Sequence, residues 1–155
     1  MEIKTIVLSF SAILISVFNY GRQQAAPAKQ PADAIVGVWL TQEKDGKVEI
    51  YRSGDKFFGK LMWGKNLYEK DGKTLKKDIK NPEPSQRERT LLNMVMLRDF
   101  MYKEGEWKDG RIYDPRSGKT YSSTMKLKDG NLEVRGYIGL PAFGKSTVWT
   151  RPLKK

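Results

Sequence analysis

Apolar and polar residues alternate along most of the chain beyond residue 34, and a two-residue period of this kind predicts half-buried β-strands. The segment 132–138 shows the pattern clearly, because Leu132, Val134 and Ile138 alternate with charged or aromatic residues. The pattern occurs in 35–40, 48–52, 57–63, 107–113, 119–127, 132–138 and 146–151, and more weakly in 74–79 and 94–102. We therefore expect about eight to ten antiparallel strands.

Turn-forming dipeptides separate these segments. Asp-Gly occurs at 45–46, 71–72, 109–110 and 129–130, and Ser-Gly occurs at 53–54 and 117–118. Such dipeptides supply the positive φ angles of tight hairpin turns, so each one predicts a reversal between neighbouring strands. One place favours a helix: Ser85 and Glu88 have the spacing of a capping box and predict a short helical turn near Ser85.

This order of elements predicts an all-β fold. With so little helix, the strands can bury their apolar faces only by packing sheet on sheet or by closing into a barrel. Few connections between the strands are long enough for the crossovers of a Greek key. Closure into an antiparallel up-and-down β-barrel is therefore favoured.

The N-terminal region has a different composition. Lys4 precedes an uncharged, mostly apolar run from Ile6 to Phe18, and the chain then becomes polar and rich in Ala, Gln and Pro. This order is typical of a secretory signal peptide. A membrane anchor is the competing interpretation, but a spanning helix needs about 20 apolar residues and this run is shorter.

The domain boundaries follow from that interpretation. We expect a signal peptide at 1–21 with cleavage between about 21 and 28, a disordered linker at 22–33 and one domain at 34–153. The mature protein is then exported, periplasmic or secreted, with no transmembrane segment after cleavage.

The residue composition narrows the possible chemistry. The chain of 155 residues carries a net charge of +11 and has no cysteine and no histidine. This excludes disulfides, thiolate nucleophiles, imidazole acids or bases, and zinc or copper sites built on Cys or His. We predict no cofactor, no metal site and no catalytic residue.

Three longer stretches resemble a known family. Gly37-x-Trp39 near the start of the domain and Arg151 near its end resemble the signature of lipocalin-like (calycin) barrels. The stretches 110–121, 132–139 and 147–151 are similar to the bacterial domain-of-unknown-function family 2147. The resemblance implies a lipocalin-like barrel in an exported protein, in which Arg151 stacks on Trp39 to close one end and Gly37 belongs to the same closing motif.

A barrel of eight strands leaves an interior that is filled by side chains or holds one small ligand. The alternation and the resemblance offer a set of inward-facing candidates for ligand contact. They are Phe57, Leu61, Trp63, Tyr113, Tyr121, Met125, Val134 and Ile138. The alternative for each is an ordinary core residue. Together they fit a partly apolar pocket with phenolic hydroxyls, so the leading hypothesis is noncovalent binding or carriage of a small, partly apolar ligand.

An enzyme would have to use carboxylates or tyrosines. Asp78, Asp99, Asp114 and Glu133 are available, but nothing in their spacing selects a catalytic pair. The sequence around Asp114 (Asp-Pro-Arg-Ser-Gly) is first a good turn sequence. We therefore favour a protein that is not an enzyme.

The positive charge raises the question of an anionic partner such as nucleic acid. Basic domains often bind nucleic acid, but here lysines outnumber arginines, many lysines flank turns, and the signal peptide directs the chain away from nucleic acid. We expect no nucleic-acid partner. The alternative function is a cell-envelope structural or interaction module that docks an anionic partner through its basic outer surface.

Overall fold

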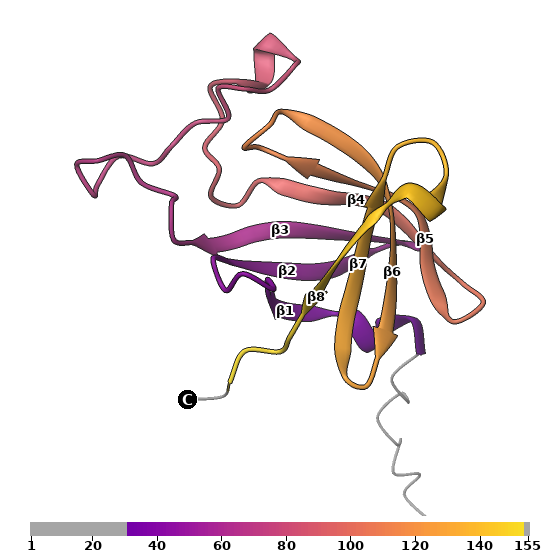
Figure 1. The fold of residues 1–155 in the computed structure, drawn as a ribbon. Coiled ribbons are helices and arrows are strands. Elements are labelled where there is room, and N and C mark those ends of the chain that lie inside the picture. The colour runs from indigo at the N-terminus through magenta and orange to yellow at the C-terminus, as the bar shows by residue number, and fades with distance from the viewer. Residues whose placement is uncertain (1–30, 154–155) are drawn as a thin grey trace, which may run out of the picture.

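The computed structural model describes residues 31–153, so the predicted signal peptide, its cleavage site and residues 22–30 of the predicted linker lie outside the described residues. The described part folds into strands and short 3-10 helices (Figure 1). In chain order they are η1 (Pro31–Ile35), β1 (Gly37–Leu40), β2 (Gly46–Ser53), β3 (Lys56–Gly64), η2 (Pro84–Gln86), β4 (Val95–Lys103), β5 (Glu106–Asp114), β6 (Lys119–Lys128), β7 (Asn131–Tyr137), η3 (Pro141–Phe143) and β8 (Lys145–Trp149). Within these residues no helix is long and apolar enough to cross a membrane.

The strands form one sheet in their chain order, β1 to β8, and each neighbouring pair is antiparallel. The first and last strands meet at an isolated bridge between Leu40 and Thr150. Each of these residues donates its backbone N–H to the other's carbonyl, at 2.8 and 3.0 Å. The sheet thereby closes on itself, and the predicted all-β, antiparallel up-and-down barrel is confirmed.

Two expected elements differ from the structure. The weak strand predicted at 74–79 is wrong, because these residues belong to the long link between β3 and β4, where only the isolated bridges Tyr68–Leu75 and Lys77–Thr90 form. We call residues 65–94 the β3–β4 connection. The helical turn near Ser85 exists as η2, but it begins at Pro84 and has no side-chain cap.

One predicted turn is a bulge. Asp109-Gly110 lies inside β5, where Asp109 adopts a φ of 61° and the pairing with β6 shifts between Trp107 and Gly110. A Cβ on Gly110 would lie 2.3 Å from the ring of Phe100, so glycine here allows that ring to pack against the strand. The reversal between β4 and β5 instead uses Glu104-Gly105, with φ angles of 52° and 82°.

One end of the barrel is closed by η1 and by aromatic side chains. Trp39 and Trp107 donate their indole N–H groups to the carbonyls of Ile35 (2.7 Å) and Ala32 (3.1 Å). Residues 31–33, which the sequence assigns to the linker, form the first part of η1. A buried indole N–H needs a hydrogen-bond acceptor, and the carbonyls around η1 supply one to each of the two tryptophans.

Arg151 completes this closed end. Its guanidinium carbon lies 3.8 Å from the centroid of the Trp39 ring, and its N–H groups donate to the carbonyls of Ala34, Val36 and Val38. Gly37 has a φ of 113°, and a Cβ there would lie 2.9 Å from Nη1 of Arg151. These contacts are the ones expected from Gly37, Trp39 and Arg151 in the sequence.

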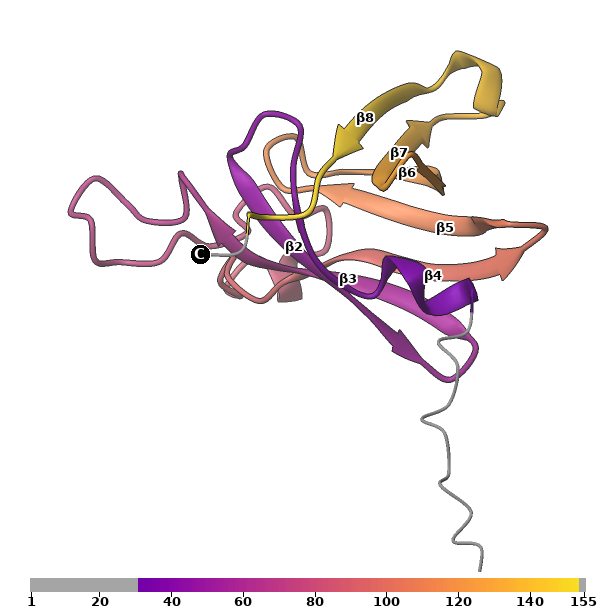
Figure 2. The same ribbon diagram turned by 90° about the horizontal axis from the view of Figure 1, so that it is seen from below.

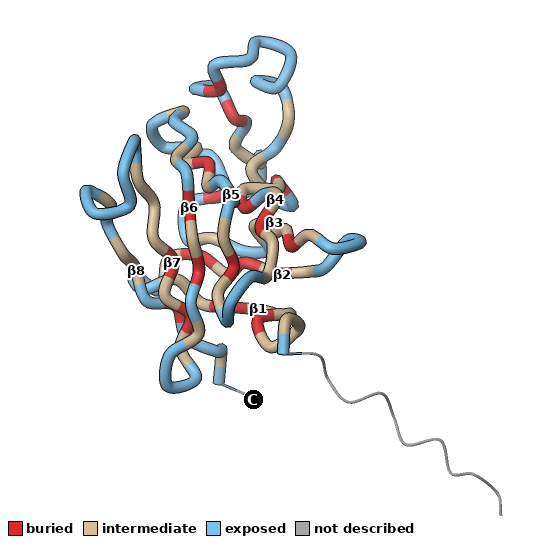
Figure 3. Tube along the Cα trace, turned by 90° about the vertical axis from the view of Figure 1, so that its right-hand side faces the viewer, coloured by how far each residue is buried: buried red, intermediate tan, exposed pale blue. Residues whose placement is uncertain are grey.

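The other end carries the longer loops. Figures 1 and 2 show the β3–β4 connection projecting away from η1, and Figure 1 shows the β7–β8 loop on the same side. Most buried residues lie along the strands, and the β3–β4 connection is exposed over much of its length but has buried positions of its own, such as Asp78 and Asn81 (Figure 3). The interior next to η1 is solid, with Ile35, Trp39, Phe100, Trp107 and Leu132 in one cluster. Any internal space therefore lies towards the loop end, which we call the mouth.

Candidate functional site

A cavity of about 360 Å³ opens at the mouth. Its lining comes from the β1–β2 turn and from strands on both sides of the barrel. The lining residues are Thr41, Gln42, Glu43, Asp45, Met96, Ile112, Tyr113, Asp114, Arg116, Tyr121, Val134, Gly136, Lys145, Thr147 and Trp149. We call this space the mouth cavity.

The apolar lining of the mouth cavity comes from paired strands. Ile112 pairs with Tyr121 and Val134 pairs with Thr147, which places both pairs on the inner face. The buried Trp149 donates its indole N–H to Thr147 Oγ1 at 3.0 Å. The inner surface is thus aliphatic and aromatic with a few hydroxyl groups, which is the usual composition of a small-molecule site.

Charged side chains of both signs surround the opening. Arg116 lies 3.2 Å from Asp114 and 3.9 Å from Asp45. Partial burial alone would raise the pKa of Asp114, but hydrogen bonds from Ser117 Oγ, from the Arg116 backbone N–H and from its side chain outweigh burial and lower the pKa. Asp114 is therefore a carboxylate at neutral pH that shapes the predicted β5–β6 turn.

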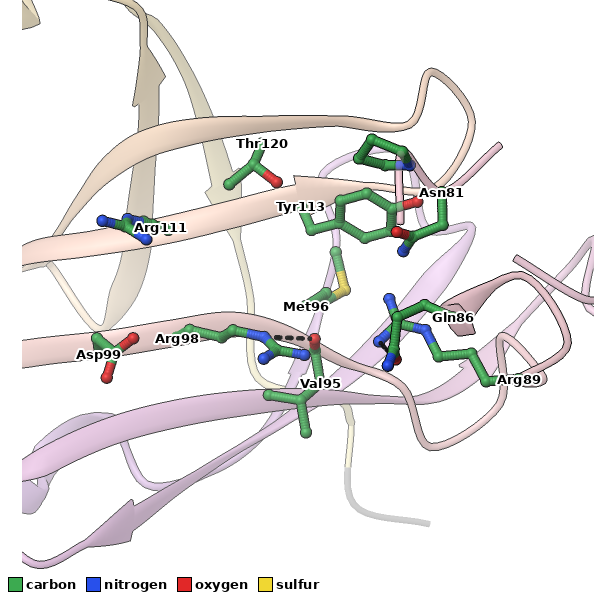
Figure 4. A pocket seen from close by; sticks show the side chains of 11 residues that line it. Asn81, Gln86, Arg89, Val95, Met96, Arg98, Asp99, Arg111, Tyr113 and Thr120 are labelled. Atoms are coloured by element: carbon green, nitrogen blue, oxygen red, sulfur yellow. Dashed lines mark hydrogen bonds between the residues drawn. The ribbon is translucent and has the colours of Figure 1, made fainter. Parts of the chain in front are cut away.

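A second cavity of about 450 Å³ lies outside the barrel, between the β3–β4 connection and the outer face of β4 to β6 (Figure 4). Its lining residues are Asn81, Pro82, Gln86, Arg89, Val95, Met96, Arg98, Asp99, Arg111, Tyr113 and Thr120. We call it the outer cleft. Met96 and Tyr113 line both cavities, so their side chains separate the two spaces.

A buried carboxylate attaches the β3–β4 connection to the barrel. Asp78 is 1% exposed and accepts hydrogen bonds from Tyr113 Oη (2.6 Å) and Asn81 Nδ2 (2.7 Å). Arg89 adds two more through Nε (3.0 Å) and Nη2 (2.7 Å). Both oxygens of Asp78 are therefore occupied by donors from the barrel and from its own connection.

This network shifts two pKa values in opposite directions. Burial alone would raise the pKa of Asp78, but the hydrogen bonds from Tyr113, Asn81 and Arg89 outweigh it and lower the pKa. Burial, together with the hydrogen bond to Asp78, raises the pKa of Tyr113 to about 12. The ionised Asp78 and the neutral Tyr113 are the forms that hold the connection in place.

The residues that the sequence offers as ligand contacts lie in different parts of the structure. Phe57 and Met125 are buried in the closed core, and Leu61 packs against it. Tyr121 and Val134 line the mouth cavity. Whether any of them contacts a ligand stays a prediction.

Trp63 does not face the interior, and the expectation that it does is wrong. It is 41% exposed and pairs with Lys47, whose ammonium lies 5.6 Å from the centroid of its ring. The register of β2 and β3 shifts at this point, because Val48 pairs with Leu61 while Lys47 pairs with Trp63. The extra residue, Met62, moves Trp63 to the outer face.

The alternation also predicts an inward position for Ile138, and this prediction is wrong. Strand β7 ends at Tyr137, and Ile138 lies in the following loop with 72% of its surface exposed. The inward direction of alternate residues holds only while the strand continues, so Ile138 points into solvent near the mouth.

Ile112 and Tyr113, neighbours on β5, both line the mouth cavity but point to opposite faces of the strand. The bulge at Asp109-Gly110 adds one residue to β5, which turns Ile112 inward opposite Tyr121 and sends the Tyr113 hydroxyl outward to Asp78. Five further lining residues were not predicted from the sequence: Met96, Ile112, Gly136, Thr147 and Trp149. For Thr147 and Trp149, the two-residue period of the last strand was the available signal.

The comparisons with known proteins agree with the geometry. The profile of the bacterial family described as "Uncharacterized protein conserved in bacteria (DUF2147)" matches residues 37–151. A solved structure titled "Protein HP1028 from the human pathogen Helicobacter pylori belongs to the lipocalin family" is similar, with a TM-score of 0.66 and 28% identity over 77% of this chain and 83% of that chain. No curated protein sequence matches the chain.

Proposed function

The chain belongs to the bacterial DUF2147 family and has a lipocalin-like fold, and on that premise we propose that it binds one small, partly apolar molecule noncovalently in the mouth cavity. The observation that carries this proposal is the position of the space. The closed end is packed solid, whereas a cavity of about 360 Å³ lies where the barrel opens.

The lining suggests the chemistry of the ligand. Ile112, Val134 and Trp149 offer apolar contact for the body of a molecule, and the phenol of Tyr121 offers a hydrogen bond. The volume lies at the lower end of the range for small-molecule sites, about 300 to 1,000 Å³. A polar or charged end of the ligand would lie among Asp114, Arg116 and Lys145 at the opening, which supports an amphiphilic rather than a purely apolar ligand.

Export is part of the same proposal. A mature protein in the periplasm or outside the cell would meet its ligand there, and the N-terminal residue order supports that location. Fractionation of cells that express the full chain, followed by N-terminal sequencing of the product, tests it. A product that begins at Met1 in the cytoplasm contradicts it.

The outer surface gives less support to the alternative envelope role. Lysines on several strands lie close to carboxylates, as in Lys56–Asp99 (3.0 Å), Lys60–Glu49 (3.0 Å) and Lys126–Glu106 (2.9 Å). These carboxylates interrupt the positive charge on the strands that carry the lysines, whereas docking of an anionic partner is favoured by positive charge gathered on one face. Docking of a large anionic partner therefore stays a prediction from the sequence, and ligand binding is the primary proposal.

Gly136 provides a sharp test. It does not adopt a positive φ, and a Cβ there would make ordinary contacts with Ile112 Cγ2 (3.5 Å) and Tyr121 Cβ (3.7 Å) inside the mouth cavity. Gly136→Leu should therefore fill the cavity and keep the fold. The matched control is Val148→Leu, which adds bulk on the exposed outer face of β8.

The measurement is native mass spectrometry of the protein purified from its own cell envelope. We expect a reproducible added mass on the wild-type chain and on Val148→Leu, lost on denaturation and absent from Gly136→Leu. Circular dichroism checks that all three are folded. An unliganded wild-type mass under gentle conditions, or an unchanged added mass on Gly136→Leu, contradicts the proposal.

A further inference from the structure

We propose that the outer cleft is a second binding site, which takes an oxyanion group, a carboxylate or a phosphate, between Arg98 and Arg111. This site does not depend on the mouth cavity, because its arginines lie on the opposite face of the sheet. The two arginines have no carboxylate partner among the described residues.

The two arginines occupy directly opposite backbone positions on neighbouring strands. Arg98 on β4 is the pairing partner of Arg111 on β5, and both side chains are exposed on the outer face. Like charges in direct cross-strand positions destabilise a sheet. A fold that keeps such a pair without compensation has a local excess of positive charge, which an anion would neutralise.

Nothing in residues 31–153 supplies that compensation. No carboxylate oxygen lies within 4.0 Å of the guanidinium nitrogens of Arg98 or Arg111, whereas Arg52, Arg89 and Arg116 each have such a partner. The one hydrogen bond of the pair is a long contact from Arg98 Nε to the carbonyl of Val95, at 3.4 Å. Asp99 lies in the same cleft but is already paired with Lys56 at 3.0 Å.

The other residues that line the outer cleft suit a polar ligand. Figure 4 shows Gln86 and Arg89 of the β3–β4 connection on one side of the space and Thr120 of β6 on another. Arg89 is held by Asp78 and by Gln86 Oε1 (3.1 Å), so that its position is set before any ligand arrives. A site whose cationic side chains are already arranged loses less conformational entropy on binding.

The ligand class follows from these donors. Guanidinium groups bind carboxylate and phosphate oxygens through charge-assisted, often bidentate hydrogen bonds. The anion can belong to a free small molecule or to the headgroup of a lipid. The chemistry of recognition is the same for both, and separate probes distinguish the two sources.

The test uses the full mature chain at low ionic strength, without phosphate in the buffer. Isothermal titration calorimetry measures binding of inorganic phosphate and of succinate, and vesicle sedimentation compares phosphatidylglycerol with phosphatidylcholine. The variants are Arg98→Gln and Arg111→Gln. The matched control is Lys128→Gln, which removes one positive charge at the exposed far end of β6.

We expect a saturable response for the wild type and for Lys128→Gln that is at least about tenfold weaker in both arginine variants. Response to phosphate or succinate identifies a free anion, and response to phosphatidylglycerol vesicles alone identifies a lipid headgroup. Each arginine variant should also melt at a slightly higher temperature than the wild type without anion, because the like-charge pair is relieved. An effect that is only structural would not produce this rise.

Two results would overturn the proposal. One is the absence of a saturable response to any of these probes in the wild type. The other is an equal loss of binding in Lys128→Gln, which would indicate general attraction to a basic protein rather than a site. The Gly136→Leu variant separates this proposal from the mouth-cavity proposal, since it should lose the added mass and still bind the anion.

Discussion

At the closed end of the barrel, the indole N–H groups of Trp39 and Trp107 donate to carbonyls around η1, and Arg151 caps one of these rings. At the mouth, the inner surface is lined but unfilled, and the β3–β4 connection next to it is attached to the barrel in part through the hydrogen bonds of one buried carboxylate, Asp78. Packing at one end thus supplies the stability that permits an open interior at the other. Substitutions at the two ends should separate stability from binding.

The largest effect is expected at Trp39. Trp39→Ala removes a buried indole from the closed end and should lower the free energy of unfolding by about 3–5 kcal/mol. Urea unfolding followed by circular dichroism measures it. Trp63→Ala is the control, because Trp63 is 41% exposed and its removal should change the free energy by about 0.5 kcal/mol or less. Equal losses for the two tryptophans would contradict the contrast between inner and outer positions.

The next effect concerns the attachment of the β3–β4 connection. Asp78→Asn removes the charge that Arg89 and Tyr113 share and should cost about 3 kcal/mol, at the lower limit for a buried pair because Arg89 is partly exposed. Hydrogen exchange should become faster in residues 65–94, while the amides around η1 keep their protection. The exposed Glu83→Gln is the control. Faster exchange throughout the barrel would show that Asp78 supports more than the connection.

A smaller loss is expected for Arg151→Lys. Lysine keeps the positive charge, but it cannot stack a planar group on Trp39 while donating to Ala34, Val36 and Val38. The free energy of unfolding should fall by about 1–2 kcal/mol. Urea unfolding measures the change. If the role of Arg151 were purely electrostatic, the lysine variant would be as stable as the wild type at every salt concentration.

The pH dependence should be flat near neutrality and should appear only at the extremes. The lowered pKa of Asp78 gives a stabilising contribution that is complete above its unfolded pKa near 3.8 and is lost as the pH falls below it. The raised pKa of Tyr113 gives a second stabilising contribution, which is complete below pH 10 and is lost as the pH rises towards about 12.

Ultraviolet absorbance measures the second effect directly. Tyr113 should ionise near pH 12, and Tyr113→Phe should remove that late step from the titration. Tyr68→Phe, which changes an exposed tyrosine, is the control and should leave the step near pH 12 in place. A late step that persists in Tyr113→Phe contradicts the assignment.

The sequence predicted the strands well because the two-residue period is a local property. It predicted the facing of individual side chains less well, because an inserted residue reverses the alternation beyond it. Trp63 follows such an irregularity, and Tyr113 follows the bulge at Asp109-Gly110. Asp-Gly favours positive φ angles in a turn and in a bulge alike, so the dipeptide alone does not distinguish them.

The candidate sites were harder to predict because they depend on contacts between distant residues. Asp78 meets Tyr113 across 35 positions in the chain, and nothing in the intervening sequence signals the meeting. Arg98 and Arg111 become a pair only once the β4–β5 register is known. A cavity at one end was expected, because a lipocalin-like barrel of eight to ten strands was predicted, but lining residues such as Ile112 are identified only once the register of the strands is known.

The strand order also has a consequence for how the chain folds. Each hairpin joins neighbours in sequence and can form early, whereas the contact between Arg151 and Val38 spans 113 positions. Closing so long a loop has the highest entropic cost in the molecule. We therefore expect ring closure to be the last step of folding, so that Arg151 mainly slows unfolding and hardly affects the rate at which the barrel assembles.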